Sequence, residues 1–180
     1  FEFYNAAKAA GVKRVVLTSS MVSVMEKDAP DNGKEYTASD WSDVNSARIN
    51  PYGKSKTLAE RAAWDFMASG EAGGMELAVI NPGAILGPVL SADTSSSLEI
   101  VRQLMDRALP ACPRIGFPVV DVRDVADAHL AAMTRPEASG KRFVCTEEHA
   151  WFSEIAAVLG LTPAGPTVGR EVGYWLLVGA

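Results

Sequence analysis

The stretch Arg14-Val-Val-Leu-Thr-Ser-Ser20 decides the fold that we expect of this chain. Its apolar, β-branched part follows Gly11 and predicts a buried strand over residues 14–17, of the kind found in parallel sheets. Three hydroxyl residues, Thr18 to Ser20, come where this strand would end. In a doubly wound sheet, ligands bind beyond the carboxyl ends of the strands. These hydroxyls are therefore candidates for a binding or catalytic site.

Helical and extended patterns alternate on both sides of this stretch. A second buried strand is predicted over Met75-Glu-Leu-Ala-Val-Ile80 and is expected to stop at Asn81-Pro-Gly83. The remaining expected elements are helices over residues 1–10, 52–68, 98–108, 121–133 and 152–159, extended segments over 117–120 and 142–145, and a polar loop over 26–50. The helix over residues 121–133 could be capped by Asp121 or Asp124. Strands separated by helices predict an α/β fold, a Rossmann-type doubly wound parallel sheet.

The helix after the polar loop opens with Pro51-Tyr-Gly-Lys-Ser-Lys56. A tyrosine and a lysine four residues apart on a helix share one face, with about 5–6 Å between their Cβ atoms. A neighbouring ammonium favours ionisation of a phenol, which can then give its proton to a carbonyl oxygen near neutral pH. Taken alone, the pair could be an amphipathic tyrosine and a solvated lysine. Its convergence with residues 18–20 and 81–83 at the strand ends favours a catalytic site.

Four motifs occur in a fixed order along the chain. They are Val16-Leu-Thr-Ser-Ser20, Pro51-Tyr-Gly-Lys-Ser-Lys56, Asn81-Pro-Gly-Ala-Ile-Leu-Gly-Pro88 and Val120-Asp-Val-Arg-Asp-Val-Ala-Asp-Ala-His129. Together they resemble the extended short-chain dehydrogenases/reductases, and within them the dihydroflavonol reductase, cinnamoyl-CoA reductase and aldehyde reductase branch. The resemblance covers nearly the whole chain. It implies NAD(P)H-dependent reduction of an aldehyde or ketone.

The resemblance also implies three catalytic residues. Ser20 would hydrogen-bond the substrate carbonyl, with Ser19 as the alternative if the alignment is off by one. Tyr52 would donate the proton, and Lys56 would assist its ionisation and hold the ribose hydroxyls of the nicotinamide. The chemistry is consistent, because hydride addition builds negative charge on the carbonyl oxygen and O–H donors aimed at that oxygen stabilise it.

Cofactor contacts are implied at the same places. Backbone N–H groups of residues 81–85 would meet the nicotinamide carboxamide, and Pro82 would pack on its ring. The expected cofactor-binding residues are Thr18, Ser19, Tyr52, Lys56, Pro82, Gly83, Ala84, Ile85 and Ser97. NADP is the expected cofactor, with NAD left open. The Gly-rich phosphate motif of the family is absent from this sequence, so we expect a segment of a longer protein, cut before Phe1.

We expect residues 1–180 to form a single, partial NAD(P)-binding domain. Segments at roughly 85–118 and 147–180 would contribute to a small substrate-binding lobe. The expected partner is a small-molecule carbonyl substrate, and pairing into a homodimer is left open.

Composition limits the partners and the kinds of site that we expect. Charged residues make up 22% of the chain and the net charge is −5, without a Lys/Arg cluster, which disfavours nucleic acid and anionic membranes as partners. No stretch is long and apolar enough to predict a membrane span. Cys112 and Cys145 predict reduced thiols and a cytoplasmic setting. Together with His129 and His149 they lack metal-binding spacing, so no metal site is expected.

Three other functions stay open at this point. An epimerase or dehydratase could use the same three residues, and net consumption of NAD(P)H would separate it from a reductase. A nucleotide-sensing protein could keep the fold without turnover. A serine hydrolase using Ser20 and His129 is disfavoured because the sequence has no G-x-S-x-G elbow.

Overall fold

The computed structural model describes residues 2–28, 35–91, 95–108, 112–161 and 171–172. The chain divides into two compact units. Unit 1 consists of Phe1–Gly83 and Arg123–Cys145, and unit 2 of Ala84–Val122 and Thr146–Ala180. Unit 2 contains both segments for which the sequence predicts a substrate-binding role, and that role stays a prediction.

A three-stranded parallel sheet, in the order β1-β2-β6, forms the centre of unit 1. Its strands are β1 (Arg14–Thr18), β2 (Glu76–Pro82) and β6 (Arg142–Cys145). At the carboxyl ends, Thr18 lies opposite Ile80, and Pro82 lies opposite Cys145. The parallel strands confirm the predicted α/β, Rossmann-type sheet.

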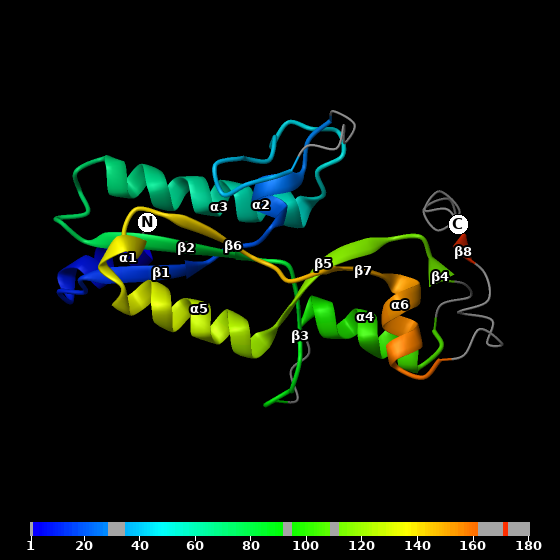
Figure 1. Ribbon diagram of the computed structural model, residues 1–180. Coiled ribbons are helices and arrows are strands. Elements are labelled where there is room, and N and C mark those ends of the chain that lie inside the picture. The colour runs from blue at the N-terminus through cyan, green and yellow to red at the C-terminus, as the bar shows by residue number, and fades with distance from the viewer. Residues whose placement is uncertain (1, 29–34, 92–94, 109–111, 162–170, 173–180) are drawn as a thin grey trace. The chain divides into compact units, whose positions relative to one another are not determined.

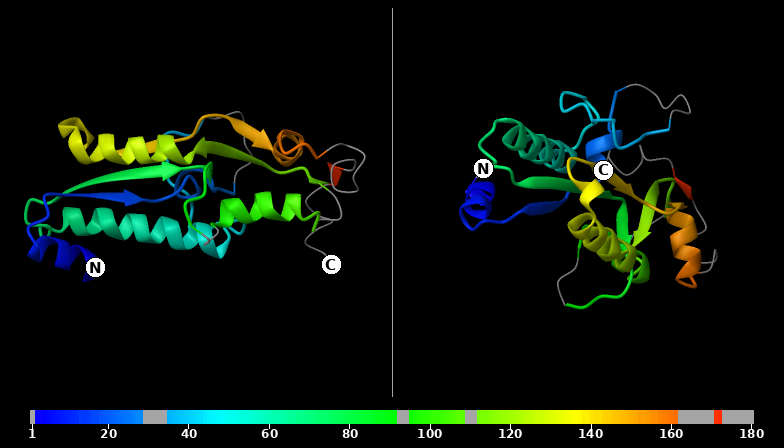
Figure 2. Two further views of the ribbon diagram at one scale, coloured as in Figure 1. Left: turned by 90° about the horizontal axis from the view of Figure 1, so that it is seen from below. Right: turned by 60° about the vertical axis from the view of Figure 1, so that its left-hand side comes forward.

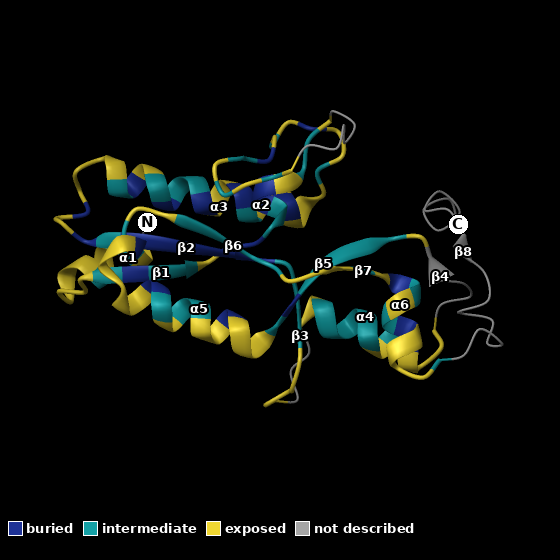
Figure 3. Cartoon of the chain, viewed as in Figure 1, coloured by how far each residue is buried: buried dark blue, intermediate teal, exposed yellow. Residues whose placement is uncertain are grey.

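Helices cover both faces of this sheet, as Figures 1 and 2 show. The helical elements of unit 1 are α1 (Glu2–Ala9), α2 (Val22–Met25), α3 (Pro51–Ala68), α5 (Val122–Thr134) and the 3-10 turn η1 (Pro136–Ala138). Phe66 of α3 packs with Leu77 on one face, whereas Ala132 of α5 packs with Ile80 on the other. Alternate side chains of β2 thus enter opposite cores, and β2 is almost wholly buried (Figure 3).

Unit 2 has its own sheet and apolar cluster. Its elements are β3 (Ala84–Leu86), α4 (Ser96–Met105), β4 (Cys112–Pro113), β5 (Gly116–Asp121), β7 (His149–Trp151), α6 (Phe152–Val158) and β8 (Glu171–Val172). β5 pairs in parallel with β3 and antiparallel with β7, and β4 pairs with β8. Leu104 of α4 and Phe152 of α6 meet in the core of this unit.

Some predicted boundaries are wrong. β2 does not stop before Asn81 but continues through Pro82, because a proline at the end of a strand still offers a carbonyl, and this one accepts a hydrogen bond from Met21 N at 2.9 Å. The short helix α2 was not predicted. His149 is exposed and belongs to β7, a strand that was not predicted.

The buried face of α3 also differs from the apolar pattern. Leu58 and Ala59 are apolar, but both residues are exposed. Gly53, Thr57 and Glu60 are buried instead, in line with Ala63 and Phe66. The first half of α3 therefore turns a polar face to the interior, next to the ends of the strands. In the described part of the chain, no helix is both long and apolar enough to cross a membrane.

Candidate active site

The carboxyl ends of β1 and β2 are joined by a ladder of hydrogen bonds. Ser19 N donates to Ile80 O at 2.8 Å, and Met21 N donates to Pro82 O at 2.9 Å. The side chain of Asn81 donates to Ser20 O at 3.2 Å. Residues 19–21 and 80–82 are therefore held side by side, as expected for neighbouring parallel strands.

The two serines of this segment have different surroundings. Ser19 is buried, and its hydroxyl is bonded to Glu60 Oε2 at 2.5 Å and to Ser23 Oγ at 3.1 Å. The Ser20 hydroxyl accepts a bond from Val22 N at 3.3 Å and makes no other hydrogen bond among the described residues. Both serines are buried, but the Ser20 hydroxyl proton is not engaged by a described residue, whereas the Ser19 hydroxyl is bonded to Glu60.

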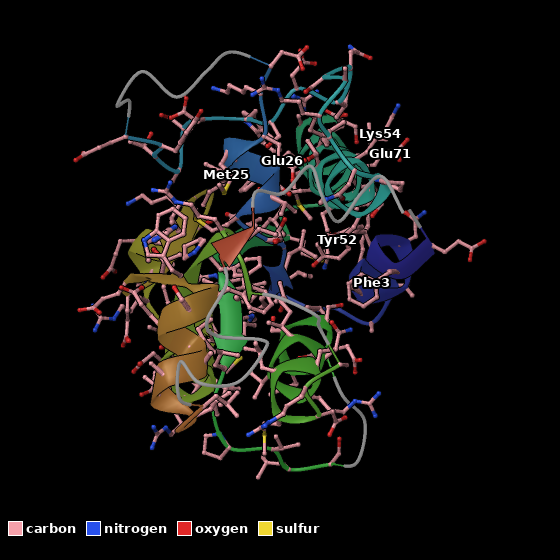
Figure 4. The ribbon with its side chains drawn as sticks, turned by 90° about the vertical axis from the view of Figure 1, so that its right-hand side faces the viewer. Phe3, Met25, Glu26, Tyr52, Lys54 and Glu71 are labelled. Carbon is pink, nitrogen blue, oxygen red and sulfur yellow. The ribbon has the colours of Figure 1, made fainter. Side chains whose placement is uncertain are left out.

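Tyr52 and Lys56 lie in the first two turns of α3. The helix starts there because Asn50 caps it, accepting a bond from Gly53 N at 2.8 Å, and Pro51 occupies the first helical position. Tyr52 is 52% exposed, and Lys56 Nζ lies 6.0 Å from the centroid of its ring. In Figure 4, Tyr52 and Lys54 leave the helix in different directions.

Close packing of α2 against α3 brings the start of α3 to the serine segment. α2 begins two residues after Ser20, and Glu26 follows its last turn. A Cβ atom on Gly53 would lie only 2.7 Å from Glu26 Oε2 and 3.2 Å from Ile49 Cγ1, so glycine allows this approach. Ser20 and Tyr52 are consequently placed at the same end of unit 1, where α2 lies beside the start of α3 in Figure 1.

The contact with α3 also affects the carboxyl group of Glu26. Burial raises the pKa of Glu26, while a hydrogen bond from the backbone of Asn50 opposes this shift. Its Oε2 atom is buried without a hydrogen-bond partner among the described residues. The folded protein therefore disfavours the charged form of this side chain.

A buried polar network links the serine segment to α3. Glu60 is completely buried, and its carboxylate accepts bonds from Ser19, from Asn81 Nδ2 at 2.8 Å and from Arg142 Nε at 2.6 Å. The Arg142 guanidinium also donates to the carbonyls of residues 38 and 40 and stacks on Trp41, 3.7 Å from the ring centroid. We call Ser19, Glu60, Asn81 and Arg142 the Glu60 network.

Thr18 is exposed at the end of β1 and bonds His129 of α5. Its hydroxyl lies 2.7 Å from His129 Nε2, while His129 Nδ1 lies 2.7 Å from Val125 O. Because a carbonyl only accepts, Nδ1 donates to Val125 O, and Nε2 shares the second hydrogen bond with the Thr18 hydroxyl. His129 therefore joins α5 to the sheet.

The other predicted cofactor residues fall into two groups. Pro82 and Gly83 follow the buried part of β2 in unit 1, and Gly83 N donates to Cys145 O at 3.2 Å. Ala84 and Ile85 belong to β3, and Ser97 to α4, all in unit 2. Cofactor binding by these residues stays a prediction. Among the described residues, no group of three or more His, Cys, Asp or Glu side chains could hold a metal ion.

Comparison with known proteins gives the family. The chain matches the model of the NAD dependent epimerase/dehydratase family over residues 2–145, and it belongs to this family. The match includes Ser20, Tyr52 and Lys56. It confirms the resemblance carried by the four sequence motifs.

Three of the similar curated proteins are named reductases. The chain is 35% identical over 156 residues to tetraketide alpha-pyrone reductase 2 of Arabidopsis thaliana, covering 86% of this chain and 47% of that protein. Cinnamoyl-CoA reductase CAD2 of Medicago truncatula is 35% identical over 158 residues, with coverage of 86% and 47%. NADPH-dependent methylglyoxal reductase GRE2 of Saccharomyces cerevisiae is 32% identical over 165 residues, with coverage of 84% and 48%. The chain spans about half the length of these relatives.

Solved structures agree with the fold. The crystal structure of yeast methylglyoxal/isovaleraldehyde reductase Gre2 complexed with NADPH superposes with a TM-score of 0.78 at 27% identity, covering 94% of this chain and 55% of that one. The Rossmann-type α/β fold is thus common to both.

The sequence interpretation missed the Glu60 network. Glu60 follows Lys56 by one helical turn and Tyr52 by two, so the spacing placed it near the site, but a glutamate on a helix is usually a solvated residue. Arg142 opens an apolar strand and showed no sign of a buried partner. Only the fold reveals that the two side chains meet.

Proposed function

We propose that the complete protein containing this chain reduces an aldehyde or ketone with NADPH. Ser20 and Tyr52 would provide the O–H donors at the carbonyl oxygen, and Lys56 would support Tyr52. The observation that carries the proposal is their arrangement at the strand ends of unit 1, where the Ser20 hydroxyl proton is not engaged and Tyr52 is exposed beside Lys56.

The residues present fit a nicotinamide cofactor by their chemistry, because hydroxyl donors and one ammonium gather where the family binds it. When bound, NADPH supplies the hydride. Ser20 donates a hydrogen bond to the substrate oxygen and orients it. Tyr52 gives its phenolic proton to that oxygen as negative charge builds up, and the Lys56 ammonium stabilises the phenolate that remains.

The names of the relatives support the proposed substrate class and the proposed reductant. One curated relative is named an NADPH-dependent methylglyoxal reductase and another a cinnamoyl-CoA reductase. Methylglyoxal carries an aldehyde and a ketone, whereas cinnamoyl-CoA is a thioester, so the methylglyoxal reductase is the relative whose name supports an aldehyde or ketone. We infer an aldehyde or ketone as the substrate class and NADPH as the reductant.

An epimerase or dehydratase reaction is the second candidate, because the family model includes such enzymes. In that reaction the cofactor is oxidised and reduced again within one turnover. Two assays of the complete protein separate the candidates: one with NADPH and a panel of aldehydes and ketones, the other with the oxidised cofactor and a panel of sugar nucleotides. Product formation and the absorbance of NADPH are followed in both. One NADPH consumed per product formed supports the reductase, and product without net consumption supports the epimerase.

Matched variants of the complete protein test the residue roles. Tyr52→Phe should lower kcat by a factor of about 10² to 10⁴, the usual contribution of a general acid. Tyr36→Phe removes the same hydroxyl from the loop before α3 and should leave kcat unchanged. Lys56→Met should lower kcat, whereas Lys54→Met, on another side of the same helix, should not. Normal turnover of Tyr52→Phe with bound cofactor would refute the proposed role.

A further inference from the structure

The Glu60 network contains a charged pair in an unusual place. The side chain of Glu60 is 0% exposed and that of Arg142 is 8% exposed, with 2.6 Å between Oε1 and Nε. Removing charged groups from water is costly, and well-packed apolar residues often replace a buried ion pair without loss of stability. Stability alone therefore gives a weak reason for a carboxylate at this position.

Its hydrogen bonds connect three strand ends to one helix. Glu60 Oε2 is bonded to Ser19 at the end of β1 and to Asn81 at the end of β2, while Oε1 is bonded to Arg142 at the start of β6. Glu60 itself stands on α3. One carboxylate thus ties α3 to all three strands of the sheet.

The hydrogen bonds from Ser19 and Asn81 to Glu60 fix the position of Ser20. Ser19 is its direct neighbour, and Asn81 Nδ2 bonds both Glu60 and the backbone carbonyl of Ser20. The backbone of Ser20 is therefore held through the preceding side chain and through its own carbonyl. Both restraints end on the Glu60 carboxylate.

The helix that carries Glu60, α3, also carries Tyr52, the second proposed O–H donor. Lys56 precedes Glu60 by one turn of α3 and Tyr52 precedes it by two, so one rigid helix carries all three residues. A shift of Glu60 relative to Ser19 and Asn81 would change the distance between the Ser20 and Tyr52 hydroxyls. Arg142 balances the negative charge, so the carboxylate does not add net charge to the site.

We propose that Glu60 is a positioning residue that sets the separation of Ser20 and Tyr52 for hydride transfer. This inference rests on the proposed reductase function. It predicts an effect on kcat through Ser20 and little effect on cofactor affinity. A misplacement of about 1 Å in an active site can cost about 100-fold in rate.

A double-mutant cycle in the complete protein tests this role. Glu60→Gln keeps the shape of the side chain but removes the charge and one acceptor, and should lower kcat about 100-fold while the Kd of NADPH changes less than about twofold. In a Ser20→Ala background, the same substitution should lower kcat less than about twofold further. Glu76→Gln, which removes the acid of the Arg14–Glu76 pair at the opposite end of β2, serves as the control with unchanged kcat.

Other results overturn the inference. A kcat of Glu60→Gln close to wild type refutes it, and so does a full 100-fold loss that persists in the Ser20→Ala background. If Glu60→Gln does not fold, Ser19→Ala can replace it, because it removes only the Ser19–Glu60 bond of the network. The positioning role then requires that Ser19→Ala lowers kcat and that this loss vanishes in the Ser20→Ala background. Turnover that survives Tyr52→Phe refutes the proposed function, whereas loss with Tyr52→Phe but not with Glu60→Gln refutes the positioning role alone.

Discussion

Removing Arg142 should destabilise the protein strongly, because it leaves the Glu60 carboxylate buried without a counter-charge. Arg142→Met keeps an unbranched side chain of similar length but removes the guanidinium. The substitution removes the hydrogen bond to Glu60, two hydrogen bonds to the carbonyls of residues 38 and 40, and the stacking on Trp41. Breaking one partner of a buried pair costs about 3–5 kcal/mol. That is a large part of the roughly 5–15 kcal/mol of a typical domain.

The free energies of unfolding of wild type and Arg142→Met are compared by urea titration followed by circular dichroism. Arg102→Met is the matched control, because Arg102 and Glu99 form an exposed pair on α4, with side chains 63% and 37% exposed, worth about 0.2–0.5 kcal/mol. The double variant Glu60→Met with Arg142→Met should recover part of the loss. A cost below about 1 kcal/mol for Arg142→Met, or strict additivity in the double variant, would refute a coupled buried pair.

Three further substitutions test the surroundings of the site. Gly53→Ala should stabilise the protein by less than the about 1 kcal/mol usual for alanine over glycine in a helix, because the new methyl group meets the end of the Glu26 side chain and Ile49. The variant should be more stable in a Glu26→Ala background, and an equal change in both backgrounds contradicts the contact with Glu26. Burial raises the pKa of Glu26, so the stability contributed by its neutral form is present below its ordinary pKa of about 4.3 and is lost as the pH rises through the higher folded pKa. Glu26→Gln should therefore be more stable than wild type at pH 7 in urea unfolding and equal to it below about pH 4, and a less stable variant at pH 7 speaks against this shift. Thr18→Val should cost about 1 kcal/mol by removing the hydrogen-bond partner of His129 Nε2, and an unchanged unfolding midpoint argues against that hydrogen bond.

Periodicity and short motifs predicted most of the fold. The apolar runs of β1 and β6 and the helical spacing of α5 lie within a few residues of their observed limits. Such elements are predictable because burial on both faces of a parallel sheet requires continuous apolar strands. The end of β2 was misjudged because the turn tendency of Asn81 and Pro82 is local, whereas pairing with Val144 and Cys145 is a tertiary effect.

The candidate site was only partly predictable. Ser20, Tyr52 and Lys56 were recognised because their spacing and order carry the family motif. Glu60 was not, because its importance depends on Arg142, which lies 82 residues further along the chain. A sequence pattern reports which face of a helix is apolar, but it does not reveal that a polar face is turned inward by partners on other strands.

The rate of hydride transfer in a single turnover tests the central claim most directly. The complete protein, saturated with NADPH, is mixed with a reducible aldehyde, and NADPH oxidation is followed by stopped-flow absorbance for wild type and Tyr52→Phe. A phenol that protonates the carbonyl oxygen predicts a rate constant lower by at least about 100-fold in the variant, with NADPH still bound. Equal rate constants for the two proteins would contradict the assignment of Tyr52 as the proton donor.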